Sequence, residues 1–241
     1  MTVIESESEA GFGEKPGRQR ERKKRNHLSR EMIVTEAVAM LTEGPLDALT
    51  LRGLAKRLEV GPMSLYTYFS GRDALLNAVA DHVYALFEHP EIGASWQDYV
   101  RDWLWATYRL FQKFPAAANI INIEGRICSA WLKTWLPIAG QLQKNGLDGD
   151  DLAFAMDWFG TSTMSFIQAQ NNVGDSRQPT ALNFVSELES DDQRLAVELW
   201  SKFRKLETPR VLEFGFEQFV LGLEALVGNA TRNGPPNAPA S

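Results

Sequence analysis

Apolar residues recur at every third or fourth position through most of this chain, the spacing that places them on one face of an α-helix. In the first third of the chain the pattern predicts four helices, over residues 30–43, 51–58, 62–69 and 71–88. Gly44-Pro45 ends the first helix, and Glu59-Val60-Gly61 forms a turn between the second and the third, because glycine and proline favour turns. The second and third helices are therefore expected to form a close pair.

Residues that favour helix starts precede these segments. Ser29 and Thr50 can cap the first and second helices through their hydroxyl oxygens. Pro62 suits the first turn of the third helix, where a missing N–H leaves no bond unmade. Ser70 and Asp73 have the spacing of a capping box for the fourth helix.

The rest of the chain predicts longer amphipathic helices that are rich in aromatic residues. They are expected over residues 96–113, 117–124, 126–143, 149–171, 190–205 and 208–228. Pro137 is expected to kink or split one of them, and Thr208-Pro209 is a typical helix start. No convincing strand pattern is present, so the predicted fold class is all-α.

Two helical domains are predicted, with a segment outside them at each end. Residues 27–72 are expected to form an N-terminal three-helix domain, and residues 73–230 a larger helical domain. Residues 1–26 predict a disordered arm, because glycine and proline interrupt a stretch that has few apolar residues. Residues 231–241, which are also rich in proline, predict a disordered tail.

The charge of the chain is divided unevenly. The formal net charge is −6, yet residues 15–72 hold twelve basic and six acidic residues. The remaining residues hold thirteen basic and twenty-five acidic ones. A basic front on an acidic body favours an approach to phosphates by the basic end. The basic run over residues 18–25 is either a grip on nucleic-acid phosphates or a solvated charge run.

Several classes of protein are disfavoured. The single cysteine, Cys128, permits no intrachain disulfide and no thiolate-rich metal site, which fits a reducing cytoplasm. No uncharged apolar run approaches the roughly 20 residues needed to cross a bilayer, so no membrane partner is expected. We find no phosphate-cradling glycine loop, no paired-histidine zinc motif and no nucleophile elbow. An enzyme, a cofactor and a metal site are therefore not predicted.

The third predicted helix, over residues 62–69, is the candidate for contact with DNA. A short helix set across another by a tight turn can lie in the major groove. Leu65 and Phe69 are expected to point inward, and hydroxyl and small side chains on the other face can meet phosphates and base edges. The predicted DNA-contacting residues are Thr50, Arg52, Pro62, Met63, Ser64, Tyr66, Thr67, Tyr68 and Arg72. Alternatively, the aromatic residues form only a hydrophobic cluster between helices.

Residues 29–76 resemble the DNA-binding domain of the TetR family of bacterial transcriptional repressors. The resemblance rests on Thr50-Leu51-Arg52-Gly53-Leu54-Ala55-Lys56-Arg57-Leu58-Glu59-Val60, then Leu65-Tyr66-Thr67-Tyr68-Phe69, then Arg72-Asp73-Ala74-Leu75-Leu76, with a looser match from Ala37 to Leu41. Tyr68 stands where the family often has histidine, and Arg72 replaces the usual lysine. The resemblance implies a helix-turn-helix. Residues 212–226 are similar to the last helix of many members, which pairs with its symmetry mate.

All seven tryptophans lie outside the helix-turn-helix block. Together with phenylalanine and methionine side chains they can line an apolar pocket for a small apolar or aromatic effector, although aromatic residues at helical spacing also form plain core. The predicted ligand-binding residues are Trp103, Tyr108, Phe111, Trp131, Trp135, Met156, Phe159, Met164 and Gln168.

The helices over residues 149–171 and 208–228 are predicted to form a four-helix homodimer interface, two helices from each subunit. Small residues on them permit close approach, namely Gly160, Ser162, Ser165, Gly215 and Gly222. A two-fold dimer places two reading helices about 34–36 Å apart on a palindromic operator. The sequence thus predicts a ligand-responsive repressor of double-stranded DNA; the alternatives are a DNA-binding structural protein without an effector and, less favoured, a helical enzyme.

Overall fold

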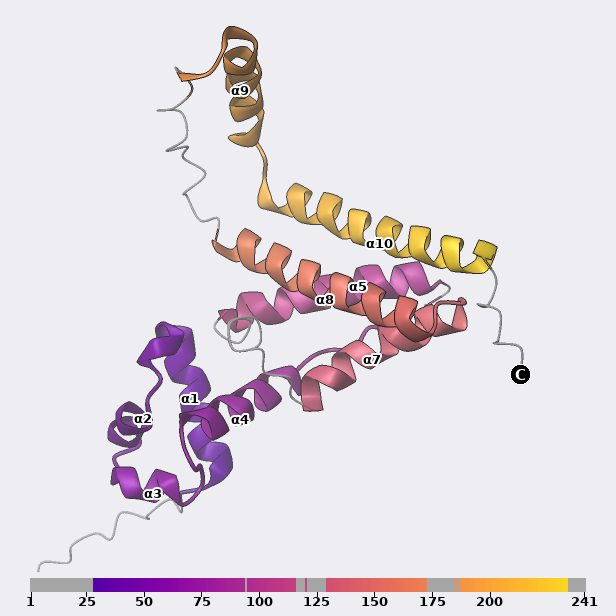
Figure 1. Ribbon diagram of the computed structural model, residues 1–241. Helices are drawn as coiled ribbons and strands as arrows, with labels where there is room; N and C mark the ends of the chain where they lie inside the picture. Colours follow the sequence, from indigo (N-terminus) through magenta and orange to yellow (C-terminus); the bar gives the residue numbers. More distant parts are fainter. Residues whose placement is uncertain are drawn as a thin grey trace, which may run out of the picture.

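The computed structural model describes residues 28–93, 95–115, 120, 129–172, 185 and 187–233, in which all regular structure is helical (Figure 1). The elements run in the order α1 Arg30–Glu43, the 3-10 turn η1 Leu46–Ala48, α2 Leu51–Arg57, α3 Pro62–Tyr66, α4 Arg72–Tyr84, α5 Trp96–Lys113, α7 Ser129–Lys144, α8 Gly149–Asn172, α9 Ser190–Phe203 and α10 Thr208–Asn233. The predicted all-α class is confirmed.

Residues 28–71, which we call the head, contain α1, η1, α2 and α3 and lie at one end of the molecule (Figure 1). The apolar stripe of each helix turns inward, so that Ile33, Leu54 and Leu65 are fully buried and Phe69 is only 1% exposed. The caps form as predicted at two helices, because Ser29 Oγ accepts from the Met32 amide and Thr50 Oγ1 accepts from the Gly53 amide. The head is a compact three-helix unit.

Helix α4 joins the head to the rest of the chain. It packs against α1 on one side and α7 on the other. At the α7 end, Asp81 accepts hydrogen bonds from the Ala130 amide at 3.2 Å and the Ser129 hydroxyl at 3.3 Å. The predicted domain division at residues 72 and 73 falls at the start of this shared helix, which couples the position of the head to that of α7.

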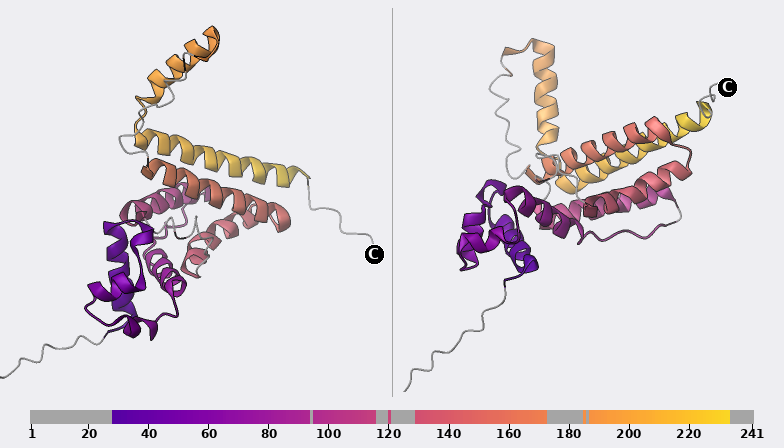
Figure 2. Two further views of the ribbon diagram at one scale, coloured as in Figure 1. Left: turned by 60° about the vertical axis from the view of Figure 1, so that its left-hand side comes forward. Right: turned by 60° about the horizontal axis from the view of Figure 1, so that its bottom comes forward.

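The body, which we define as α5, α7, α8 and α10, is a layered bundle (Figure 2). Helix α10 lies along α8 and α5. Arg101 on α5 donates to both carboxylate oxygens of Glu217 on α10, at 2.8 and 3.1 Å. Gln97, one turn before Arg101 on α5, donates to Glu224, two turns after Glu217 on α10, at 2.9 Å. These bonds fix the alignment of α10 on α5.

The glycines that were expected at a dimer interface pack within one subunit instead. A Cβ at Gly222 would stand 2.6 Å from the Trp158 ring, and one at Gly215 would overlap the Phe166 ring. Both rings belong to α8, so these glycines on α10 let it approach α8 of the same chain. The prediction that small residues permit close helix approach is confirmed for these two glycines, and the predicted interface between subunits stays a prediction.

Several predicted boundaries differ from the structure. Helix α3 ends at Tyr66 rather than at residue 69, and α4 ends at Tyr84 rather than at residue 88. The capping box is absent, because Gly71 is the N-cap of α4 and no side chain caps it. Helix α7 contains Pro137 but is not split.

Two further predictions concern the ends of late segments. Helix α10 extends to Asn233, so residues 231–233 of the predicted tail are helical. The helix predicted over residues 117–124 lies outside the described residues except at Ile120.

Helix α9 stands away from the body beside the start of α10 (Figures 1 and 2). None of its residues is buried. Its exposed apolar side chains include Leu195, Leu199 and Phe203, which follow one another at four-residue spacing on one face. The helix therefore has an apolar stripe that the described residues of its own subunit do not cover.

Candidate nucleic-acid interface

Helix α3 presents one face to solvent and buries the other. Met63 is 77% exposed and Tyr66 is 50% exposed, whereas Leu65 between them is fully buried. Pro62, Ser64 and Thr67 are exposed as well. Five of the predicted DNA-contacting residues thus form one continuous accessible surface, namely Pro62, Met63, Ser64, Tyr66 and Thr67. An apolar methionine and a phenol beside hydroxyls suit contacts with base edges and phosphates.

The turn between α2 and α3 fixes the angle at which this surface is held. The Val60 amide donates to the Ala55 carbonyl at 3.0 Å, and the Glu59 amide donates to the Lys56 carbonyl at 3.2 Å. This is the Schellman arrangement that ends a helix, with Glu59 in the left-handed region at φ 55°. The chain accepts an unfavourable conformation at Glu59 in order to turn sharply here.

The start of α2 carries two predicted contacts. Thr50 Oγ1 accepts from the Gly53 amide at 3.0 Å, so its oxygen caps the helix while its hydroxyl proton remains a donor. Arg52 is exposed. A helix N-terminus with a cation next to it favours a phosphate.

Arg57 anchors α2 to α1 rather than facing outward. Its guanidinium donates to both oxygens of Glu43, one at 2.6 Å, and to Glu36. The hydrogen bonds from Arg57 lower the pKa of Glu43 and raise that of Arg57 itself. This cluster holds α2, and with it the turn and α3, at a fixed place in the head.

Tyr68 is placed differently from the prediction. It is half-buried, packs against the core, and donates its hydroxyl to the Leu28 carbonyl. The prediction that Tyr68 is exposed beside Tyr66 was wrong, because α3 ends at Tyr66 and the chain turns inward before Phe69. The contact also places residue 28, where the basic segment joins the described chain, at the end of α3.

Arg72 likewise has partners inside the protein. Its guanidinium donates to the carbonyls of Leu49 and Leu46, each at 3.3 Å. These bonds tie the start of α4 to η1. The role of Arg72 as a phosphate contact stays a prediction, and the structure gives this residue a positioning role in the head.

Arg30, for which no role was predicted, connects α1 to the segment after α3. Its guanidinium lies 4.5 Å from the centre of the Phe69 ring and donates to the Tyr68 carbonyl at 3.1 Å. No sequence spacing predicts this contact, because the partners are 38 residues apart.

The predicted ligand-binding residues are distributed over α5, α7 and α8. Trp103 and Phe159 pack together with ring centres 5.7 Å apart, and Trp131 and Trp135 stack at 5.3 Å. Trp103 also donates its indole N–H to the Thr134 carbonyl at 2.7 Å, which brings these two pairs to one place. Met156 and Met164 are buried on α8, and Gln168 is half-buried there. Phe111 and Tyr108 pack instead on Tyr84 and Trp105.

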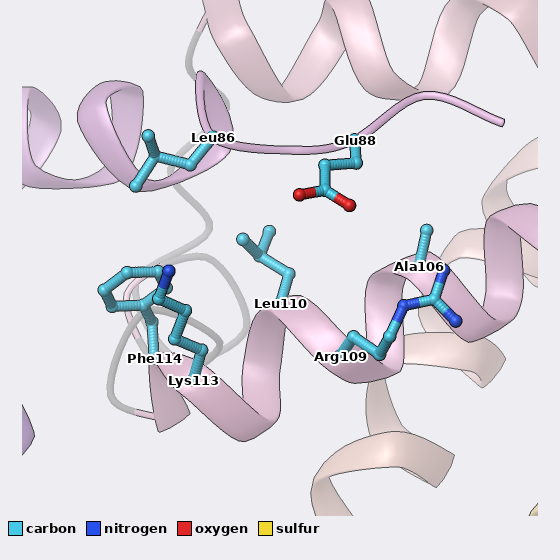
Figure 3. A pocket seen from close by; sticks show the side chains of 7 residues that line it. All are labelled: Leu86, Glu88, Ala106, Arg109, Leu110, Lys113 and Phe114. Atoms are coloured by element: carbon cyan, nitrogen blue, oxygen red, sulfur yellow. The ribbon is translucent and has the colours of Figure 1, made fainter.

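A pocket of about 180 Å³ lies between the α4–α5 connection and α5 (Figure 3). Its walls are Leu86, Glu88, Ala106, Arg109, Leu110, Lys113 and Phe114. Figure 3 shows the Glu88 carboxylate pointing toward Leu110 from the opposite wall, and the Lys113 ammonium lies 5.5 Å from the centre of the Phe114 ring. None of the nine predicted ligand residues lines this pocket. Its charged residues, Glu88, Arg109 and Lys113, were not predicted to form a site.

Among the described residues, no helix combines the length and the apolar character that spanning a bilayer requires. Among the same residues, no three or more histidine, cysteine, aspartate or glutamate side chains are grouped so that they could hold a metal ion.

Comparison with known proteins connects the head to one family. Residues 33–79 match the bacterial regulatory proteins of the tetR family. An HTH-type transcriptional repressor of Mycobacterium tuberculosis is 30% identical over 115 residues, 46% of this chain and 44% of that protein. The tetracycline repressor protein class D of Escherichia coli is 30% identical over 96 residues, 39% of this chain and 44% of that protein. The chain thus matches less than half the length of these relatives.

Solved structures resemble a larger part of the chain. Apo ActR from Streptomyces coelicolor has a TM-score of 0.71 and 26% identity, covering 84% of this chain and 98% of that one. ActR in complex with actinorhodin has a TM-score of 0.66 and 26% identity, covering 82% and 96%. The likeness to ActR therefore includes the body as well as the head.

Proposed function

Because the chain belongs to the TetR family of bacterial regulatory proteins, we propose that it is a transcriptional repressor that binds a palindromic DNA operator as a homodimer and responds to a small apolar or aromatic effector. The observation that carries this proposal is the exposed face of α3, formed by Met63 and Tyr66 and held on a buried core by Leu65. Such a protein acts in the bacterial cytoplasm, where the operator is.

DNA is expected to meet the head along α3 and the start of α2. Tyr66, Ser64 and Thr67 supply hydroxyls for phosphates and base edges, and Met63 supplies an apolar contact for a thymine methyl group. Arg52 and the N-terminus of α2 bind a phosphate. The basic segment before Leu28 continues from the end of α3, so it can follow the DNA backbone.

The partner subunit is expected to cover the outer face of α8 and α10. These two helices carry large exposed apolar side chains, which are Phe154 and Trp158 on α8 and Phe214, Leu221 and Leu226 on α10. An apolar surface of this kind is typical of a protein–protein interface. Packing two such faces together gives the four-helix interface predicted from the sequence and separates the two heads by a fixed distance.

The effector is expected to bind in the body, where α5, α7 and α8 meet. Trp103, Trp135 and Phe159 come together there, and ActR, which resembles this chain over the body, has been solved in complex with actinorhodin. A ligand that prefers one arrangement of the bundle shifts α7, and α4 carries that shift to the head.

The reading surface is tested by replacing Tyr66 with alanine. Tyr66→Ala is expected to weaken operator binding about tenfold or more, because it removes a direct contact without touching the core. Ile92→Ala, at a residue that is 66% exposed outside the head, is the matched control and should leave binding unchanged. Fluorescence anisotropy at fixed salt measures the affinity, and equal affinities for both variants would refute the assignment of α3.

A further inference from the structure

Buried tryptophan and threonine side chains of the body differ in whether their polar atoms have partners. Trp103 donates its indole N–H to the Thr134 carbonyl at 2.7 Å, and Thr107 donates its hydroxyl to the Trp103 carbonyl at 2.9 Å. Trp135 Nε1 and Thr163 Oγ1 are just as well covered, yet neither has a hydrogen-bond partner in the described part of the chain. Such exceptions are uncommon, because a buried donor has given up its bonds to water.

The two atoms lie at one seam between α7 and α8. Gly160 on α8 faces the edge of the Trp135 ring, since a Cβ built on Gly160 would stand 3.3 Å from the indole nitrogen. Thr163 follows Gly160 by three residues and so lies on the same side of α8, one turn further on. Gly160 contributes no side chain between the Trp135 indole and this side of α8, on which Thr163 also lies.

The surroundings of the seam are apolar and aromatic. Trp131 stacks on Trp135 with their planes 26° apart, and Phe159, one turn before Thr163, is fully buried. A charged ligand group would lose its hydration here without an opposite charge to replace it. An indole N–H can only donate, whereas a hydroxyl can donate or accept. The group that satisfies both atoms is therefore a neutral acceptor oxygen.

We propose that Trp135 and Thr163 are the polar anchors of the effector site, and that the effector carries a carbonyl oxygen on a planar aromatic frame. This assignment rests on the proposed function, in which the body senses a small molecule. The carbonyl oxygen accepts from the indole N–H with one lone pair and from the Thr163 hydroxyl with the other. The flat frame lies against the neighbouring rings.

The first test measures thermal unfolding of the ligand-free protein in matched variants. Trp103→Phe and Thr107→Val break hydrogen bonds and should lower Tm by about 2–4 °C or more. Trp135→Phe loses the same ring volume as Trp103→Phe but breaks no hydrogen bond, so its Tm should fall less, and Thr163→Val should leave Tm unchanged or raise it. Equal losses in all four variants would show that a resident group already satisfies both atoms in the free protein, and would overturn the proposal.

The second test compares two bicyclic probes of similar size by calorimetry, coumarin with a carbonyl oxygen and naphthalene without one. The wild-type protein should bind coumarin about tenfold more tightly than naphthalene. Trp135→Phe and Thr163→Val should each reduce that ratio severalfold by weakening coumarin alone, while Thr107→Val keeps it. A wild-type protein that does not prefer coumarin, or a preference that survives both anchor variants, would refute the anchors.

Operator affinity is measured separately, so the proposed function and the anchors can fail independently. A coumarin preference that depends on Trp135 and Thr163 supports the anchors. If coumarin then leaves operator affinity unchanged, that second result counts against regulation by this site. Release of operator by coumarin in wild type and in both anchor variants alike would overturn the anchors and support the regulation.

Discussion

Long polar side chains of the head bond within the protein, whereas two buried polar atoms of the body have no partner among the described residues. In the head, the side chains of Arg57, Arg72 and Tyr68 each bond to named groups elsewhere in the head or at its border with α4. In the body, Trp135 Nε1 and Thr163 Oγ1 have no partner in the described chain. The outer face of α8 and α10 also exposes Phe154 to 73% and Phe214 to 67%.

The difference shows which part of the protein is complete in a single chain. A head that is held together by its own contacts can move as one rigid DNA-binding unit. A body with uncovered apolar rings and unpaired donors reaches its full set of contacts only with further molecules, which we propose to be a second subunit and an effector.

Removing a core ring should destroy the head. Phe69 is 1% exposed and lies against the Arg30 guanidinium, so Phe69→Ala should cost about 3–5 kcal/mol of stability. Urea unfolding followed by circular dichroism measures the loss, and operator binding should disappear with it. A stability within 1 kcal/mol of wild type, on the order of an ordinary surface change, would mean that the head is not held by this core.

Placing a charge on the outer face of α10 should break the dimer and spare the fold. Phe214→Glu is expected to weaken association by about 2 kcal/mol or more, roughly thirtyfold, since it buries a carboxylate in an apolar contact. Ile92→Glu is the matched control, because Ile92 and Phe214 are 66% and 67% exposed. Sedimentation equilibrium distinguishes them, and similar dimer stability in both variants would place the interface elsewhere.

Removing one hydroxyl of the head should affect stability and not recognition. Tyr68→Phe loses the bond to the Leu28 carbonyl and should cost about 1 kcal/mol. Operator affinity, measured under conditions where the variant is fully folded, should remain within twofold. A larger fall in affinity at unchanged stability would instead support the DNA contact that the sequence predicted for this residue.

Acid should slightly weaken the ion pairs that Arg57 forms with Glu43 and that Arg101 forms with Glu217. Hydrogen bonds from Arg57 and Arg101 lower the pKa of Glu43 and Glu217 below the ordinary value of 4.5. A lowered folded-state pKa gives stabilisation that is present above 4.5 and is lost as pH falls through the folded value. Between pH 5 and 3, roughly, Tm should fall less in the double variant Glu43→Gln, Glu217→Gln than in wild type. Both ion pairs are exposed to solvent, which keeps their effect on Tm small. Parallel curves of Tm against pH for wild type and the double variant would show that neither ion pair contributes.

Sequence reasoning worked best where structure is decided locally. The spacing of apolar residues located α1 and α5 to the residue, and the hydroxyls of Ser29 and Thr50 act as the caps that were expected. Periodicity and capping depend on neighbours within one turn, so a linear reading captures them. The same reading extended α3 to residue 69, because the apolar period continues there although the chain has left the helix.

Contacts between distant segments were not accessible in this way. The bond from Tyr68 to Leu28 joins residues 40 positions apart, and no spacing encodes it. Gly215 and Gly222 were recognised as sites of close approach, but the partner proved to be α8 of the same chain. Residue types alone do not say which of two possible neighbours fills a gap, since both a second subunit and the same subunit offer large rings.

The central claim, that two heads on a dimer read a palindromic operator, is tested most directly by selecting bound sequences from a random pool of double-stranded DNA with the full-length protein. We expect an inverted repeat whose half-site centres lie about 10–10.5 base pairs apart, or a multiple of that, one turn of DNA being about 34–36 Å. Selection of a single unrepeated site, or enrichment without any shared sequence, would contradict it.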